Sequence, residues 1–151
     1  MRCTEAHWRP LDPILIMRPL YGNPDARCAM ADKLLIVLSN TDPANPAELG
    51  APFQQAAVAA AMDYDVEVVF TGLAAKLAVK GVAERLYPTP ENDKSAYDMM
   101  RDAHEAGAVF KVCSPALELW GDDLIPEIHE TVGGAYLISV AMDDRTVTFT
   151  Y

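Results

Sequence analysis

Three apolar runs constrain the fold of this chain more than any other feature of its sequence. They are "LLIVLS" from Leu34, "DVEVVFT" from Asp65 and "AVFKVC" ending at Cys113. The first is apolar at consecutive positions, which is the pattern of a strand covered on both faces. Such a strand belongs to a sheet that has helices on either side, so the runs predict an α/β domain.

Helix-forming segments alternate with these runs. Residues 47–63 are rich in alanine, and residues 73–86 form a second helical stretch whose middle is weakened by Gly81. Residues 96–107 form a third helix that ends in a glycine, a common C-cap signal. Polar turns rich in Asn, Asp and Pro separate the segments. The alternation predicts parallel βαβ units and a largely parallel sheet.

Two arrangements fit the end of the chain. In one, "YLISVAM" is a strand that pairs with "VTFTY" as a hairpin through "DDRT". In the other, a brief strand near residues 127–131 precedes a helix over residues 134–142, and "VTFTY" is the last strand. We predict the second arrangement because it continues the alternation of strand and helix.

The composition is that of a globular protein with a single domain. The chain has 151 residues, of which 51% are hydrophobic and 23% charged, and its formal net charge is −10. Nucleic-acid binding depends on clustered Lys and Arg, so an acidic chain without a basic run argues against it. No segment approaches the roughly 20 apolar residues that span a bilayer. We therefore expect no nucleic-acid partner, no membrane span and a cytoplasmic location.

The first residues differ from the rest of the chain. Residues 1–31 hold four prolines and show no sustained helix or strand period. Their four arginines and three acidic residues give a formal charge of +1, which leaves −11 for residues 32–151. We expect residues 1–31 to be a loose extension or a tail packed on the surface, unless they are upstream sequence ahead of a true start at Met30. Residues 32–151 are the expected folded domain.

The three cysteines, Cys3, Cys28 and Cys113, are too far apart for a CxxC motif. An odd number at wide spacing does not suit a disulfide framework or a structural zinc site, so we expect free thiols. Cys113 ends a predicted strand, and Ser114 and Pro115 suit the N-cap and first position of a following helix. The N–H groups at that helix start favour the thiolate, the reactive form of the thiol. A regular strand also places Lys111 on the same side of the sheet, where its charge adds to this field.

Cys113 has two interpretations from its residues alone, a nucleophile or a small buried hydrophobe. Other candidate sites are weaker. "EIHE" around His129 resembles a metal cluster, but its side chains alternate across a strand, and His104 is expected on the surface. The turn "NTDPANP" occupies the place of a flavin phosphate loop without the hydroxyl-rich composition. We expect Trp120 to pack and the methionines to fill the core, namely Met62, Met99, Met100 and Met142.

From about Lys33 to Tyr151 the sequence resembles the DsrE/DsrF-like proteins, which include the TusD-type sulfur-relay subunits. The resemblance rests on the order of several features. These are the opening apolar strand with its Asn-Thr-Asp turn, the unit "PFQQAAVAAAMDYDVEVVFTG", the segment "AGAVFKVCSPALELWG" with one cysteine at a strand end, and the ending "DLIPEIHETVGGAYLISVAMDDRTVTFTY".

This resemblance implies a three-layer α/β/α fold with a five-stranded, mainly parallel sheet. It also implies that Cys113 corresponds to the cysteine that carries a persulfide in sulfur-trafficking members, so that the chain acts as a sulfurtransferase between donor and acceptor proteins. It also implies a homo-oligomer, a trimer or hexamer. From the residues themselves we expect no cofactor and no metal. Two alternatives stay open: a non-catalytic assembly subunit of the same fold, and a flavodoxin-like module that binds a nucleotide or flavin.

Overall fold

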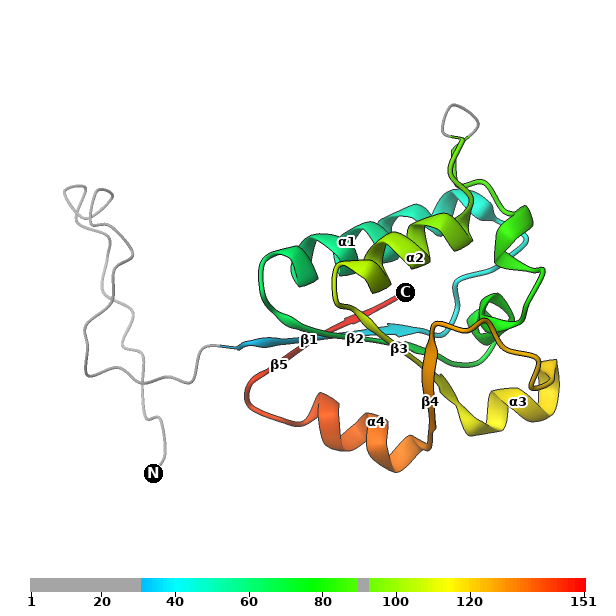
Figure 1. Cartoon of the computed structure of the whole chain (residues 1–151). Coiled ribbons are helices and arrows are strands. Elements are labelled where there is room, and N and C mark those ends of the chain that lie inside the picture. The colour runs from blue at the N-terminus through cyan, green and yellow to red at the C-terminus, as the bar shows by residue number, and fades with distance from the viewer. Residues whose placement is uncertain (1–30, 90–92) are drawn as a thin grey trace, which may run out of the picture.

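The computed structural model describes residues 31–89 and 93–151, and these form five strands and four α-helices in alternating order (Figure 1). Our expectations for residues 1–30, including those for Cys3 and Cys28, lie outside the described residues. The strands are β1 (Lys33–Leu38), β2 (Asp65–Phe70), β3 (Val109–Cys113), β4 (Ile128–Val132) and β5 (Thr146–Thr150). The α-helices are α1 (Gly50–Ala61), α2 (Ala96–Glu105), α3 (Ser114–Trp120) and α4 (Gly134–Ala141).

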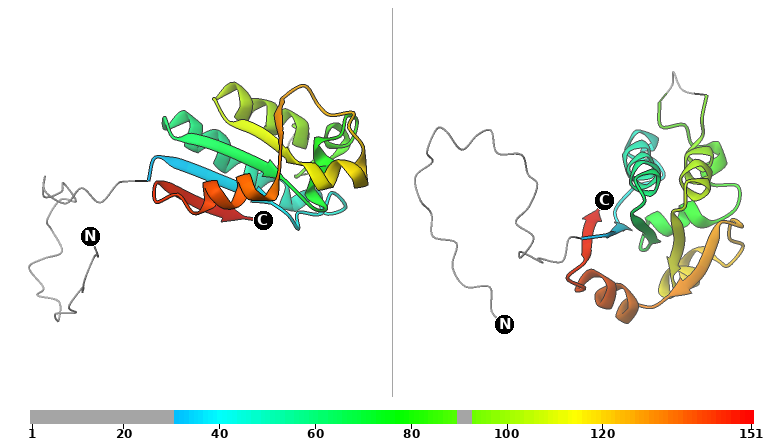
Figure 2. Two further views of the ribbon diagram at one scale, coloured as in Figure 1. Left: turned by 90° about the horizontal axis from the view of Figure 1, so that it is seen from below. Right: turned by 60° about the vertical axis from the view of Figure 1, so that its left-hand side comes forward.

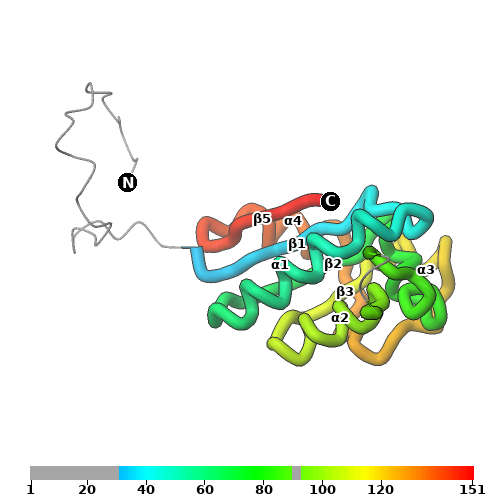
Figure 3. The backbone as a smooth tube through the Cα atoms, turned by 90° about the horizontal axis from the view of Figure 1, so that it is seen from above, coloured from blue at the N-terminus to red at the C-terminus, as the bar shows by residue number. Residues whose placement is uncertain are grey.

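The strands make one parallel sheet in the order β4-β3-β2-β1-β5. Figure 2 shows α1 and α2 on one face of this sheet and α4 on the other, and Figure 3 shows α1 lying over β1 and β2 with β5 beyond it. The predicted three-layer α/β/α fold is therefore confirmed. The predicted C-terminal helix is also confirmed. The hairpin is wrong because β5 pairs in parallel with β1, with Lys33 opposite Thr146.

Two local predictions differ from the structure. Residues 73–86 do not form an α-helix but two short 3-10 segments, Ala74–Ala78 and Ala83–Arg85. Backbone bonds explain the break, because Val79 forms a bridge with Leu124 and the amide of Lys80 donates to Asp123 O at 3.0 Å. The strand predicted near residues 127–131 is Ile128–Val132, one residue later.

The face under α1 and α2 holds the main apolar core. The rings of Phe53, Phe70 and Phe110 are fully buried, with centroids 5.8 to 6.4 Å apart. α2 begins with a capping box in which the amide of Asp98 donates to Ser95 Oγ at 3.1 Å and the amide of Ser95 donates to the Asp98 carboxylate at 3.0 Å. This satisfies N–H groups that would otherwise lack partners at the helix start.

The four methionines do not share one environment. Met100 is buried in the core and Met99 packs against it, as predicted. The prediction is wrong for Met62 and Met142, which are 61% and 77% exposed. Both are the C-cap residues of helices, Met62 of α1 and Met142 of α4, in the turns that lead to the next strands.

Candidate functional site

Cys113 is the last residue of β3 and lies at the carboxyl edge of the sheet. Its backbone is extended, with φ −75° and ψ 129°, and it is itself the N-cap of α3. Ser114 is therefore the first helical residue, so its predicted place as the N-cap is wrong by one residue. The strand conformation persists through Cys113, and the helix begins directly after it. The Cys113 side chain makes no hydrogen bond to the helix start.

A second helix start lies beside Cys113. In the β3–β4 ladder Cys113 is opposite Val132, and Gly133, the N-cap of α4, follows Val132 directly. A Cβ added at Gly133 or Gly134 would meet no atom within 4 Å, so this side of the sheet edge is open. Neighbouring strands thus deliver two helix N-termini to the same edge. Backbone N–H groups at such ends favour a nearby negative charge.

The residue Cys113 is 8% exposed, and it is a free cysteine. Its side chain lies on the face of the sheet that α4 covers, because it shares a register position with Val132, whose side chain packs against α4. The thiol is therefore largely covered but lies beside the open glycine edge. This geometry limits a reaction partner to an approach along the carboxyl edge.

Lys111 lies two residues before Cys113 and on the same face, as the regular strand predicts. Its ammonium, however, is already surrounded by acceptors. Lys111 Nζ lies 2.6 Å from Glu130 Oε1 and 3.4 Å from Glu67 Oε2, and it donates to the Tyr136 hydroxyl. Tyr136 in turn donates to Glu67 Oε2 at 2.7 Å, and Lys33 Nζ lies 2.5 Å from Glu67 Oε1.

These five side chains form one connected set of hydrogen bonds and ion pairs, which we call the charged network. They are Lys33, Glu67, Lys111, Glu130 and Tyr136. Burial alone would raise the pKa of Glu67, but hydrogen bonds from Lys33 and Tyr136 outweigh it and hold that pKa below its ordinary value. Burial alone would lower the pKa of Lys111, but hydrogen bonds to Glu130 and Tyr136 raise it. The network therefore keeps Lys111 protonated, but the carboxylates of Glu67 and Glu130 balance its positive charge. Lys111 consequently adds less positive field at Cys113 than the sequence alone predicts.

The sequence missed this network, although part of its signal was present. Glu67 and Lys111 are the only charged residues inside otherwise apolar stretches of β2 and β3. A charge in a strand that is covered on both faces requires a partner, so the two residues predict each other once the strands are neighbours. Tyr136 carries no such signal, because only the position of α4 brings its hydroxyl to Glu67.

Trp120 ends α3 and lies against the loop after β2. Its indole Nε1 donates to Gly72 O at 2.9 Å, and Lys76 Nζ lies 5.3 Å from the ring centroid. These contacts hold α3 over the carboxyl ends of β2 and β3. Trp120 thus packs, as expected, and positions the helix that starts at Cys113.

The side chains of the weaker candidate sites do not converge on one point, because several of them bind other residues. Glu127 accepts a hydrogen bond from Tyr97 at 2.9 Å and Glu130 pairs with Lys111, while His129 is exposed. Across residues 31–89 and 93–151, no group of three or more His, Cys, Asp or Glu side chains is placed to hold a metal ion. In the turn after β1, Asp42 accepts from the amide of Ala44 at 2.8 Å, so its carboxylate is used inside the turn.

The comparisons with known proteins agree with this architecture. The sequence pattern of the DsrE/DsrF-like family matches residues 33–149, from the start of β1 into β5. Comparison with curated proteins gives no match. Among the described residues, no helix has both the length and the apolar character needed to cross a bilayer. Because the family pattern covers 117 of the 151 residues, with four complete strands, all four α-helices and most of β5, the chain belongs to the DsrE/DsrF-like family.

Proposed function

We propose that Cys113 is a sulfur carrier, which holds sulfane sulfur as a persulfide and passes it between protein thiols. The observation that carries this proposal is the position of Cys113, at the end of a central parallel strand and at the start of α3. Ligands and reactive groups in open α/β sheets gather at this edge. Membership of a family with sulfur-relay members supports the same chemistry.

The proposed reaction proceeds in two exchanges. The Cys113 thiolate attacks the outer sulfur of a donor persulfide, the donor S–S bond breaks, and the donor leaves as a thiolate while Cys113 becomes a persulfide. An acceptor thiolate then attacks that outer sulfur and releases the Cys113 thiolate. The transferred sulfur keeps its oxidation state, so neither exchange requires an oxidant or a reductant.

The surroundings of Cys113 support both exchanges. The starts of α3 and α4 lie at the same edge of the sheet as Cys113, and helix N-termini favour a nearby anion such as the persulfide. The open edge at Gly133 and Gly134 leaves room for a donor or acceptor cysteine on a flexible segment. The proposed partners are therefore proteins that donate sulfur and proteins that accept it. Membership of the family also leads us to propose that the chain assembles with further copies of itself into a trimer or hexamer.

The test is intact-protein mass spectrometry after incubation with a small-molecule persulfide donor. We expect wild type to gain whole sulfur atoms and Cys113→Ala to gain none, with both proteins folded by circular dichroism. Cys28→Ala is the matched control and should load like wild type. Loading of Cys113→Ala at the wild-type level would assign the carrier to another cysteine and contradict the proposal.

A second candidate, a non-catalytic assembly subunit, is favoured by the 8% exposure of Cys113. In that role the cysteine only packs between β4 and α4. Thiol alkylation of the native protein separates the two, because a packed thiol reacts only as fast as the site opens. Modification of Cys113 in native protein at a rate near that of the unfolded chain would support the carrier. Modification that follows global unfolding would support the subunit.

A further inference from the structure

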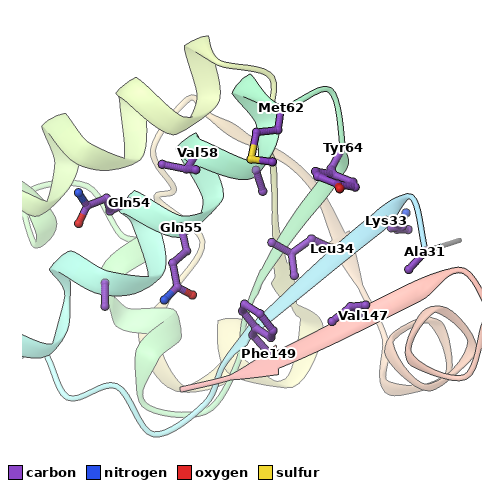
Figure 4. A pocket seen from close by; sticks show the side chains of 12 residues that line it. Ala31, Lys33, Leu34, Gln54, Gln55, Val58, Met62, Tyr64, Val147 and Phe149 are labelled. Atoms are coloured by element: carbon purple, nitrogen blue, oxygen red, sulfur yellow. The ribbon is translucent and has the colours of Figure 1, made fainter. Parts of the chain in front are cut away.

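An apolar groove lies between α1 and β5 (Figure 4). Leu34 lines it and packs against the core under α1 and α2, so the groove lies on the face of the sheet opposite the Cys113 side chain. It encloses about 660 Å³. α1 and the residues after it contribute Val58, Met62 and Tyr64, and the strands contribute Leu34, Val147 and Phe149. The proposed sulfur chemistry uses none of these residues.

The lining residues are unusually exposed for their type. Met62 is 61% exposed and Val58 54%, and the exposed fractions of Tyr64, Val147 and Phe149 lie between 41% and 45%. Apolar side chains that converge on one concave surface mark a binding site more often than a scattered set does. β5 is also an edge strand, and no strand among the described residues pairs with its outer side. Uncovered edges of this kind favour pairing with another segment.

The chain itself brings a suitable occupant to this groove. Ala31 lines the groove, and residues 1–30 precede it directly. Their longest apolar run is "PILIM", residues 13–17. The 13 residues from 18 to 30 can span at most about 43–47 Å. α1, with 12 residues, is only about 18 Å long. The run can therefore reach every part of the groove.

Charge also favours this occupant. Residues 1–31 carry a formal charge of +1 and the rest of the chain −11. Arg18 follows the apolar run directly, and Asp63 precedes Tyr64, which lines the groove. Asp63 is exposed and attracts a cation beside the groove, whereas Asp65 already pairs with Lys33 at 3.0 Å.

We infer that residues 13–17 dock in the groove between α1 and β5 of their own chain. The linker holds the run at a local concentration in the millimolar range, so even weak apolar contacts keep the groove occupied. Docking removes Val58, Met62 and Phe149 from water and covers the β5 edge. The inference does not depend on the sulfur-carrier proposal, because it involves neither Cys113 nor its face of the sheet.

Photo-crosslinking of the full chain tests the inference. Leu15 is replaced by p-benzoylphenylalanine, the protein is irradiated, and the crosslinked peptides are mapped by mass spectrometry. We expect a product of monomer mass that joins position 15 to α1 or β5, in a yield independent of protein concentration. In the same protein Met62→Asp should lower this yield at least about tenfold, because a carboxylate among apolar side chains loses hydration.

Met142→Asp is the matched control, since Met142 is equally apolar and exposed but lies outside the groove. It should leave the yield unchanged, and thermal unfolding should show both aspartate variants to be folded. A product of dimer mass would assign the groove to a second copy of the chain and overturn docking within one chain. Crosslinks to other surfaces, or no crosslink, would overturn the inference altogether.

Discussion

The two faces of the sheet are built from opposite kinds of side chain. Under α1 and α2, the rings of Phe53, Phe70 and Phe110 fill a core without charge. Under α4, the same two central strands, β2 and β3, present Glu67 and Lys111. Four apolar residues complete this second face: Leu35, Val37, Val69 and Val132.

The helices differ in the same way. α1 buries four residues, whereas no residue of α4 is fully buried, although its sequence is strongly apolar. α4 is attached to the sheet through Tyr136 and through the partly buried Leu137, Val140 and Ala141. We conclude that the first face supplies most of the stability. The second holds the residues next to Cys113 in place through a smaller set of polar contacts.

The largest effect is expected on the apolar face. Phe110→Ala removes a fully buried ring that packs beside both other phenylalanines, and so it leaves a cavity in the core. It should lower the free energy of unfolding by about 3–5 kcal/mol. Urea unfolding measures this loss. A loss below about 1 kcal/mol would show that the face tolerates large cavities and would contradict the division between the faces.

The next effect is expected from the charged network. Lys111→Met leaves Glu67 and Glu130 without their shared cation, and should cost about 3 kcal/mol because Glu67 is buried. Glu67 keeps Lys33 as a partner, which limits the cost. The double variant Lys111→Met with Glu67→Leu is the control. It should be more stable than Lys111→Met alone, since it removes the uncompensated charge. A double variant that is less stable than the single one would contradict this account.

The sequence predicted the fold well because local signals and tertiary packing agree in most elements. The apolar run of residues 34–38 lies in the strand β1, and Gly107 follows the end of α2 with a positive φ, as the local patterns predict. Residues 73–86 were mispredicted because helix propensity is local, whereas their backbone bonds go to residues 123–125, which are far along the chain.

The candidate site could be predicted only in part. The strand-end position of Cys113 follows from the apolar run and the Ser-Pro after it. Its 8% exposure and its proximity to Gly133 depend on the β3–β4 register, which no local pattern encodes. The bulge in β4 between the partners of Phe110 and Lys111 shifts that register by one residue.

Tyr136→Phe, on the face under α4, should give the smallest of these losses in the free energy of unfolding. It removes the hydroxyl that donates to Glu67 and accepts from Lys111, and a hydrogen bond to a charged group contributes about 1.5–3 kcal/mol to stability near neutral pH. The folded-state pKa of Glu67 is lowered from its ordinary 4.5, partly by the bond from Tyr136. The stabilisation is therefore fully present above that value and is lost as the pH falls through the folded-state pKa.

The cost of Tyr136→Phe should consequently shrink as the pH is lowered below 4.5. Tyr151→Phe is the matched control. The Tyr151 hydroxyl donates to the amide of Gln55, which is neutral and does not titrate, so the cost of this substitution should not depend on pH. Urea unfolding of both variants and wild type from neutral to acid pH measures the two differences. Parallel pH profiles for the two variants would show that Tyr136 stabilises α4 by packing alone. In that event the second face would resemble the first, and the charged network would not hold the helix beside Cys113.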